Sequence, residues 1–457
     1  MNRFYLQDQI EEDKFEINLE SSMVSFFDLC QELHQEFQRQ WEESGDYMEE
    51  LLDVQKKAIM GYEKETLFFK ENIRKYLKEN GVTNCSFPNW YQSLEEGIYH
   101  ENWGMGSLAQ WFSSEYTNSG SAKVIGERIY FMEKGRMVLK EQRMSSERRA
   151  QLIGALLLLK PKERSNRDFH EIYLLDGTRV TIFKGDMVKK DQDVIIFRRY
   201  IIPSYTFEEQ GERGTIPKEA IPLFKTMVAL GFNVAFLGAV RTAKTTFLST
   251  WQSYEEEDLE GVLVETDPEI PLHNLMPKAP IVQLIADNEK LSGITKNLMR
   301  SDADYIVMGE AREGIALDTL LRITGKGTRR VKITYHCGNP EDFPYEVAGE
   351  IVKSMGGDQG FLAKRVASAF EYLFHFVQLR DKDQKRLKSI SEMSLNREKG
   401  LIVVRPICQY DFLTEMWVFV PEIGESKKGI ALQENPGQYI IFEKILSELA
   451  SREGGVR

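Results

Sequence analysis

The stretch Asn233-Val-Ala-Phe-Leu-Gly-Ala-Val-Arg-Thr-Ala-Lys-Thr-Thr246 passes from an apolar run into a loop of small residues and then into a helical pattern. A phosphate-binding loop has a glycine, four further residues, a second glycine, a lysine and then a serine or threonine. Gly238, Lys244 and Thr245 stand in register with that pattern, whereas Ala243 takes the place of the second glycine. The stretch therefore predicts a strand, a phosphate-binding loop and a helix, in that order.

The residue types in this loop suit separate parts of polyphosphate binding. Backbone N–H groups of the loop and of the following helix N-terminus can surround phosphate oxygens. The side chain of Lys244 is predicted to reach the outer phosphates, and the hydroxyl of Thr245 to bind Mg²⁺. The predicted nucleotide-contacting positions in the loop are Gly238, Ala239, Val240, Arg241, Thr242, Ala243, Lys244, Thr245 and Thr246.

Position 243 is where this loop departs from the full pattern, because Ala243 replaces a glycine. Glycine permits a positive φ angle and lets the backbone approach a ligand closely. If position 243 adopts a positive φ angle, alanine costs about 1–2 kcal/mol there. A cost of that size weakens nucleotide binding by about tenfold or more without abolishing it.

Two apolar runs downstream of the loop end in carboxylates. One run ends at Glu265, with Glu269 shortly after it, and the other, residues 305–310, ends at Glu310. The C-terminal ends of neighbouring parallel strands meet at one crevice, so we expect these carboxylates to lie near the loop. Glu310 is predicted to polarise the attacking water or to bind Mg²⁺, and Glu265 and Glu269 to support it. Solvated strand ends are the structural alternative.

A third β-type run, Ile333-Thr-Tyr-His-Cys337, carries a histidine near its end. A single histidine at a strand end is more often structural than functional. Its place after the carboxylate motif favours a contact between His336 and the terminal phosphate, as a hydrogen-bond donor or as a proton partner.

Composition limits the classes of protein to which the chain can belong. The 457 residues carry a formal net charge of −12, with 42% hydrophobic and 28% charged residues. A dedicated nucleic-acid-binding protein needs clustered lysine and arginine, so this balance argues against nucleic acid as a partner. Cys30, Cys85, Cys337 and Cys408 form no CxxC pair, and we expect no zinc site and no disulfide framework. No run approaches the roughly 20 apolar residues that span a bilayer, so we expect membrane contact to need a partner.

The pattern of residues divides the chain into three parts. Residues 1–84 have apolar positions at helical spacing and are predicted to form an acidic helical segment. Residues 85–206 mix short β-type runs with one helix, as in a small α+β domain, and the turn Asp176-Gly177 indicates a hairpin. Residues 207–457 alternate apolar runs with helical stretches, as in a mostly parallel sheet with helices on its faces. The polar residues 207–217 are interpreted as a linker.

Together, these motifs resemble the type II/type IV secretion-system ATPase superfamily, most closely its CpaF-like branch. Residues 309–312 match the Gly-Glu-x-Arg element of that superfamily, with Glu310 and Arg312 in its acidic and basic positions. Upstream, Arg198 and Arg199 resemble a pair of arginines that faces the nucleotide in the superfamily. The combination is more specific than any single motif.

The sequence also departs from the superfamily pattern. Besides Ala243, the acidic box has Thr266 in place of its second acid, and Lys326 stands where the superfamily has a histidine. The stretch 327–332 adds basic residues shortly before His336. We therefore expect these departures to cluster at the active site.

The resemblance, which covers roughly residues 95–425, implies an α/β fold with a RecA-like P-loop ATPase domain after a small α+β domain and an N-terminal helical segment. It implies a homohexameric ring that binds ATP and Mg²⁺ and hydrolyses ATP. It further implies a cytoplasmic motor at the inner face of the membrane, which powers secretion or type IV-like pilus assembly through a polytopic inner-membrane platform protein. The implied catalytic residues are Lys244, Glu265, Glu269, Glu310, His336 and Arg312, with Arg198, Arg199 and Arg300 as charge stabilisers.

Three other functions stay open on the sequence. A degenerate, weakly or non-hydrolysing scaffold subunit would assemble normally when Lys244 is replaced by alanine. A DNA-transfer ATPase would have DNA-stimulated turnover, and the acidic balance argues against it. A small-molecule kinase would leave the second domain without a role.

Overall fold

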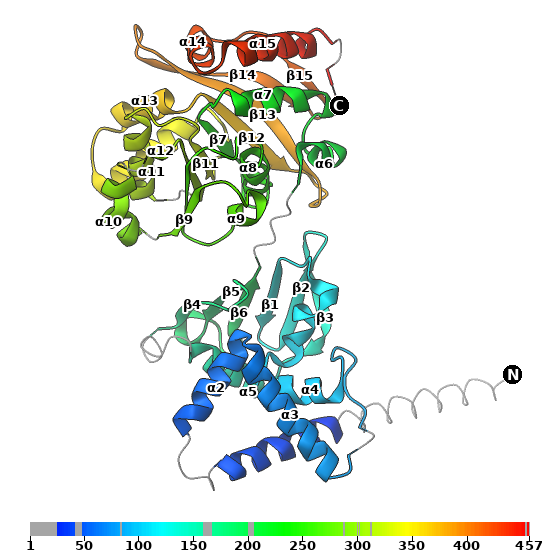
Figure 1. Cartoon of the computed structure of the whole chain (residues 1–457). Coiled ribbons are helices and arrows are strands. Elements are labelled where there is room, and N and C mark those ends of the chain that lie inside the picture. The colour runs from blue at the N-terminus through cyan, green and yellow to red at the C-terminus, as the bar shows by residue number, and fades with distance from the viewer. Residues whose placement is uncertain are drawn as a thin grey trace, which may run out of the picture. The chain divides into compact units, whose positions relative to one another are not determined.

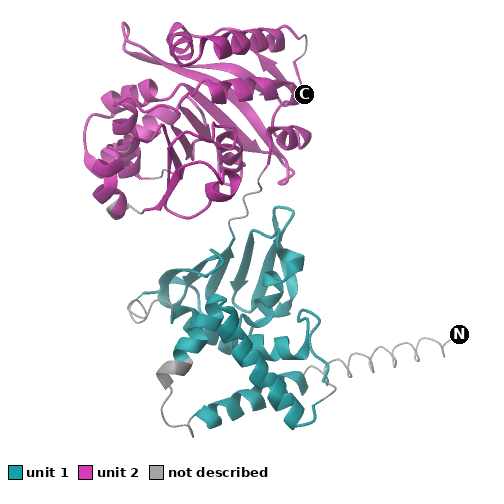
Figure 2. Ribbon diagram, in the orientation of Figure 1, with its two compact units in different colours: residues 1–201 teal, residues 202–457 magenta. Residues whose placement is uncertain are grey.

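The chain forms two compact units, Met1–Ile201 and Ile202–Arg457, which are coloured separately in Figure 2 and labelled by element in Figure 1. The computed structural model describes residues 25–41, 48–82, 85–158, 167–199, 205–286, 288–298, 300, 302–310, 313–452 and 455–456. None of the helices in these ranges combines the length and the apolar character needed to traverse a bilayer. The domain boundaries expected after residues 84 and 206 stay a prediction.

Unit 1 packs helices against an antiparallel sheet. Its helices are a helix over residues 25–41, α2 (Met48–Met60), α3 (Glu63–Glu79), α4 (Leu94–Asn102) and α5 (Ser146–Leu157), with short 3₁₀ turns η1 (Gly106–Phe112), η2 (Ser114–Tyr116) and η4 (Gly185–Met187). Its strands are β1 (Ser121–Ile125), β2 (Arg128–Glu133), β3 (Arg136–Arg143), β4 (Phe169–Tyr173), β5 (Arg179–Phe183) and β6 (Val194–Arg198), in the sheet order β3-β2-β1-β6-β5-β4. The hairpin expected at Asp176-Gly177 is confirmed, because β4 and β5 pair antiparallel across that turn.

The helical segment and the sheet of unit 1 share one apolar core. Phe37 and Phe69 lie in the same cluster of buried residues as Phe131 and Phe197. Trp103, which follows α4, belongs to the same cluster, and its ring centroid lies 4.8 Å from that of Phe37 and 4.9 Å from that of Phe69. Burial of these rings stabilises both parts at once, because aromatic side chains remove a large apolar area from water.

Unit 2 is a mixed α/β layer structure. Its helices are α6 (Phe207–Glu212), η5 (Lys218–Ala220), α7 (Ile221–Ala229), α8 (Lys244–Gln252), α9 (Leu272–Leu275), α10 (Asn288–Leu298), α11 (Gly314–Thr324), α12 (Phe343–Met355), α13 (Gln359–Ala369), α14 (Glu425–Glu434) and α15 (Pro436–Ala450). Its strands are β7 (Val234–Leu237), β8 (Gly261–Glu265), β9 (Ile281–Ile285), β10 (Tyr305–Glu310), β11 (Lys332–Tyr335), β12 (Tyr372–Gln378), β13 (Lys385–Asn396), β14 (Leu401–Asp411) and β15 (Met416–Phe419). The sheet order is β15-β14-β13-β12-β7-β11-β10-β8-β9.

The strand that leads into the loop lies inside the parallel part of this sheet. β7 pairs parallel with β11 and β12, and β11 pairs parallel with β10, so the strand that ends directly before His336 lies between the loop strand and the acidic strand. Alternate residues of β7 point to opposite faces. Phe236 belongs to a buried cluster with residues of α7, α8 and α15, whereas Leu237 belongs to one with residues of α11, α12 and α13. The expected α/β, RecA-like fold with an N-terminal α+β part is confirmed.

The linker expected at residues 207–217 was wrong in its first half. Residues 207–212 form α6, which Thr206 begins with a capping box closed by Glu209. Phe207 is fully buried, and its ring stacks on that of Tyr254 at 4.5 Å. The composition of this segment did not indicate a helix, because Thr206 and Glu209 of the capping box are polar and Phe207 is its one buried aromatic residue.

Candidate functional site: a phosphate loop at the carboxyl edge of the sheet

The predicted polar residues of unit 2 lie at the carboxyl ends of parallel strands, as expected. β7 ends one residue before Gly238, β8 ends at Glu265 and β10 ends at Glu310. β11 ends at Tyr335, directly before His336. Because these strands are neighbours in one parallel sheet, their ends form one edge at which side chains from distant parts of the sequence meet.

The loop has the backbone geometry of a tight phosphate cradle. Gly238 has a φ angle of +140°, and a Cβ atom there would collide with the carbonyl oxygen of Phe376 in the neighbouring strand β12. Arg241 and Ala243 have φ angles of +66° and +73°. The hydroxyl of Thr242 donates to the carbonyl of Ala239 at 2.9 Å and closes the turn. α8 follows directly, so its first N–H groups point into the same loop.

Ala243 lies in the left-handed region, with φ +73° and ψ +20°, which satisfies the condition set out from the sequence. We expect Ala243→Gly to raise the free energy of unfolding by about 0.5–1 kcal/mol. Relief of strain contributes about 1–2 kcal/mol, and the added freedom of glycine in the unfolded chain offsets about 0.4–1 kcal/mol of it. Urea denaturation measures the difference. Ala239→Gly is the matched control, since Ala239 has no positive φ angle, and an equal gain in both variants would contradict the assignment of strain.

Lys244, His336 and Glu310 form a chain of polar contacts across three strand ends. Nζ of Lys244 lies 3.4 Å from Nδ1 of His336, and Nε2 of His336 lies 2.7 Å from Oε1 of Glu310. Lys244 also donates to the carbonyl oxygens of Gly238 and Ala239, at 2.8 and 2.7 Å. Since an ammonium group only donates hydrogen bonds, Nδ1 of His336 accepts from Lys244, and Nε2 carries the proton that is donated to Glu310.

Glu265, at the end of β8, has a buried carboxyl group beside these polar contacts. Its residue is 7% exposed, and its Oε1 atom accepts from the N–H groups of Glu269 and Ile270 at 3.2 and 3.0 Å. Gly309 leaves room for it, because a Cβ atom there would lie 2.9 Å from the same oxygen. Burial, mainly, raises the pKa of Glu265 to about 8, with a smaller contribution from the charges of Glu269 and Asp267, while the two backbone hydrogen bonds oppose the rise. A carboxyl with such a pKa exchanges protons near neutral pH.

The raised pKa of Glu265 predicts a pH-dependent stability. Between about pH 4.5, the ordinary pKa of a glutamate carboxyl, and about pH 8, the folded protein keeps a proton that the unfolded chain has lost. The contribution of this group is therefore present below pH 4.5 and is lost as the pH rises towards 8. Relative to Glu265→Gln, we expect the wild-type protein to lose about 1–2 kcal/mol of unfolding free energy between about pH 5 and pH 7.

Urea denaturation of both proteins at a series of pH values checks this prediction. Glu257→Gln is the control, because Glu257 is exposed in the loop that follows α8. If the stability curves of the wild-type protein and the Glu265→Gln variant run parallel over this range, the carboxyl keeps no extra proton in the folded state.

The arginines expected to stabilise charge have varied surroundings. Arg199 is held inside unit 1, where it donates to the carbonyls of Trp111 and Tyr116, each at 3.1 Å, and lies over the Trp111 ring. Burial lowers the pKa of Arg199 from its usual value. Arg198 ends β6 and is exposed, and Arg300 is exposed beyond α10. Arg312 lies outside the described residues, so its role stays a prediction.

The basic stretch at residues 327–332 does not belong to the site, and the expectation that it clusters there was wrong. Lys332 opens β11 at the opposite end of the strand from His336. It is fully buried and forms an ion pair of 2.6 Å with Glu255. Arg330 is also buried and pairs with Glu255 at 2.5 Å and with Glu434 at 2.8 Å. These basic residues therefore hold the amino edge of the sheet together.

His375 is a residue near the loop that the sequence did not single out. It lies on β12 beside Leu237, the last residue of β7, and is 3% exposed. Burial, with the charges of Lys388 and Lys244, lowers its pKa to about 4. His375 is therefore neutral at physiological pH and adds no positive charge behind the loop. The sequence of the apolar run Tyr372–Gln378 did not indicate a functional residue, because a single histidine in such a run is usually structural.

Comparisons with known proteins concern the fold. No protein-family model matches the sequence, and no curated protein matches it. The chain is similar to the solved structure of the Yersinia pseudotuberculosis ATPase DotB, with 13% identity, a TM-score of 0.48 and coverage of 80% of this chain and 89% of that one. For the Legionella pneumophila ATPase DotB the values are 15%, 0.45, 76% and 88%.

A further similar structure is the VirB11 ATPase from the Brucella suis type IV secretion system in complex with sulphate. It shares 15% identity and a TM-score of 0.34, over 62% of this chain and 92% of that chain. Similarities of this size identify no common activity, and the function of this chain is inferred from its own residues.

Proposed function

We propose that this chain binds ATP and Mg²⁺ at the loop that precedes α8 and hydrolyses ATP there. The observation that carries the proposal is the polar chain of Lys244, His336 and Glu310, which links the loop to the ends of two further strands. A lysine for the phosphates, a carboxylate for the water and a histidine between them are groups that phosphoryl transfer to water can use. Merely solvated strand ends would give no reason for these three side chains to meet.

The loop fits a polyphosphate by shape and by charge. At Gly238 a side chain would strike the backbone of β12, so glycine is needed where the loop leaves β7, and the N–H groups at the start of α8 suit an anion. Bound ATP would supply the phosphoanhydride bond, and Mg²⁺ would neutralise charge on the phosphate oxygens. Lys244 lies at the loop and would turn its ammonium group from the loop carbonyls to a phosphate. Thr245, in the first turn of α8, would give its hydroxyl to Mg²⁺.

Glu310 is the residue of this proposal that acts on water. Its carboxylate would accept a proton from the attacking water or bind Mg²⁺ through a water molecule. His336 would orient that carboxylate through its Nε2 proton and sense the terminal phosphate from the same position. Glu265, with its raised pKa, and Glu269 would support this edge of the site.

The proposal extends from the site to a machine. The motif set of this chain supports a CpaF-like member of the type II/type IV secretion ATPases, in which six copies form a ring. The ring would act from the cytoplasmic side on a polytopic inner-membrane platform protein, in protein secretion or pilus assembly. Arg198, Arg199, Arg300 and Arg312 would stabilise phosphate charge in that assembly.

One observation favours a second candidate, a scaffold subunit of the same machine that hydrolyses ATP slowly or not at all. Ala243 holds a φ angle of +73° at the position where the loop pattern has glycine. The strain of about 1–2 kcal/mol at that position disfavours the loop conformation that would bind phosphate.

The test is ATP turnover of the purified protein with Mg²⁺, beside a Lys244→Ala variant, with the oligomeric mass recorded for both. We expect the variant to bind nucleotide about 10- to 100-fold more weakly, because a charge-assisted contact contributes about 1.5–3 kcal/mol. Its turnover should fall at least as far. Lys278→Ala is the control, since Lys278 is exposed between α9 and β9 and has no role in the proposal.

Turnover that is lost only in Lys244→Ala, on a six-subunit species, supports the motor. A ring that forms in both proteins and turns over ATP in neither would contradict hydrolysis and favour the scaffold subunit. Turnover that rises on addition of DNA would instead favour a DNA-transfer ATPase.

A further inference from the structure

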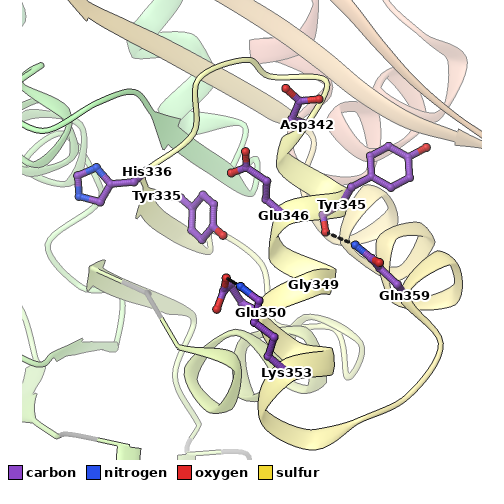
Figure 3. Close-up of a pocket in the computed structure, with 9 residues that line it drawn as sticks. All are labelled: Tyr335, His336, Asp342, Tyr345, Glu346, Gly349, Glu350, Lys353 and Gln359. Carbon is purple, nitrogen blue, oxygen red and sulfur yellow. Dashed lines mark hydrogen bonds and ion pairs between the residues drawn. The ribbon is translucent and has the colours of Figure 1, made fainter.

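A polar cavity of about 600 Å³ lies beside His336, between the end of β11 and one face of α12 (Figure 3). Three carboxylates of its lining, Asp342, Glu346 and Glu350, follow one another at a spacing of four residues. That spacing places them along one face of the helix. The cavity therefore has an acidic wall on α12.

Two of these carboxylates, Asp342 and Glu346, differ from Glu350 in their partners among the described residues. Asp342 accepts a hydrogen bond from the side chain of Asn339 at 3.1 Å, whereas Glu350 pairs with Lys353 at 2.6 Å. Throughout the described ranges, no lysine or arginine forms an ion pair with Asp342 or Glu346. Asp342, the N-cap residue of α12, and Glu346, in its first turn, lie where negative charge is favourable, so the acidic wall alone would not indicate a ligand.

The second observation is Tyr335, the last residue of β11. It is only 7% exposed and lines the cavity, and its ring packs edge-on against that of Phe343 at 5.6 Å. Figure 3 shows its hydroxyl directed into the space beside α12, towards Glu350. Within the described residues this hydroxyl has no hydrogen-bond partner, and it is not a fully buried atom, so it stays open to the cavity. Tyrosine hydroxyls in partly buried positions usually find a partner.

From these groups we infer that the cavity binds an arginine side chain carried by a basic segment of a partner protein. A guanidinium group has five N–H donors in a planar fork, which suits two carboxylates and a hydroxyl oxygen together. Tyr345, a residue that is 48% exposed, lies at the rim of the cavity. The net charge of −12 further attracts a basic segment.

The cavity also touches the proposed catalytic edge. His336 lines it and contacts Glu310 through Nε2. A bound arginine would therefore lie next to the polar chain that we assign to hydrolysis. Only this effect on turnover rests on the proposed function, whereas the binding itself does not need nucleotide.

The experiment measures the anisotropy of a fluorescein-labelled Gly-Arg-Gly-Arg-Gly peptide, added to the full chain without nucleotide. We expect the double variant Asp342→Asn/Glu346→Gln to bind the peptide about tenfold more weakly than the wild-type protein. The matched control Glu257→Gln/Asp258→Asn removes the same two charges from an exposed loop and should keep the wild-type affinity. Tyr335→Phe keeps the ring and should weaken binding about threefold, with an unchanged melting temperature.

Several results would overturn the inference. If the pocket variant and the control variant lose peptide affinity by the same factor, the peptide binds to the overall negative charge and not to the cavity. If a lysine peptide of the same length binds with equal affinity, the cavity does not select a guanidinium group. If the pocket variant has a changed oligomeric mass but an unchanged peptide affinity, the cavity contacts a second copy of this chain rather than an arginine of another protein. Loss of peptide binding with normal ATP turnover would support the inference and separate it from the proposed hydrolysis.

Discussion

Replacing Glu255 with alanine is expected to lower the free energy of unfolding by about 3–5 kcal/mol. The carboxylate of Glu255 is shared by Lys332, at 2.6 Å, and by Arg330, at 2.5 Å. Lys332 has no exposed surface, so its ammonium group would stay buried without a counter-charge. Burial already lowers the pKa of Lys332, and the charge of Glu255 opposes that change. Urea or guanidinium denaturation measures the loss.

The neighbouring Glu256→Ala is the matched control for this prediction, because Glu256 is exposed. Its effect should stay within about 0.5 kcal/mol. A second variant, Glu255→Gln/Lys332→Met, removes one buried charge from each sign and should recover part of the loss. A loss below about 1 kcal/mol in Glu255→Ala would mean that water or a different side chain compensates Lys332.

Gly238→Ala is expected to remove nucleotide binding and to lower the free energy of unfolding. Backbone strain at a φ angle of +140° costs about 1–3 kcal/mol for a residue with a side chain. The collision of the new methyl group with the carbonyl oxygen of Phe376 adds to that cost, because this oxygen belongs to the backbone of a central strand. The loop can relieve both only by moving its N–H groups away from the phosphate position.

Nucleotide titration and urea denaturation together test the Gly238 prediction. Gly293→Ala is the control, since Gly293 lies in α10 with open space around it and no positive φ angle. Alanine should stabilise that helix by about 0.5–1 kcal/mol. Wild-type nucleotide affinity in Gly238→Ala would place the phosphates elsewhere and would contradict the site.

The order of elements in unit 2 could be predicted because each element leaves a local pattern. Apolar runs alternate with helical stretches, and the loop Gly238–Thr245 is a contiguous motif. The convergence of Glu310 and His336 followed from the rule for parallel strands. Their contact and its link to Lys244 could not be predicted, because they depend on β11 lying between β7 and β10.

Proximity in the sequence misled the interpretation of the basic stretch before His336. A strand advances about 3.3 Å per residue, so Lys332 and His336 lie at opposite ends of β11 despite their small separation in the chain. The partner of Lys332 is Glu255, which is distant in sequence and has no motif around it. Long-range ion pairs of this kind leave no periodic signal.

The shared aromatic core of unit 1 has a consequence for how that unit acquires its structure. Trp103 stacks on rings from the helical segment, and the N–H of Leu175 in the β4–β5 turn donates to the carbonyl of Met60 at the end of α2. Neither part can complete its interior alone, so the helices and the sheet should melt in a single cooperative transition. The acidic helices are thus part of the folded core of unit 1. Removing residues 1–84 would therefore destabilise unit 1, and any loss of binding in such a variant would follow from its unfolding.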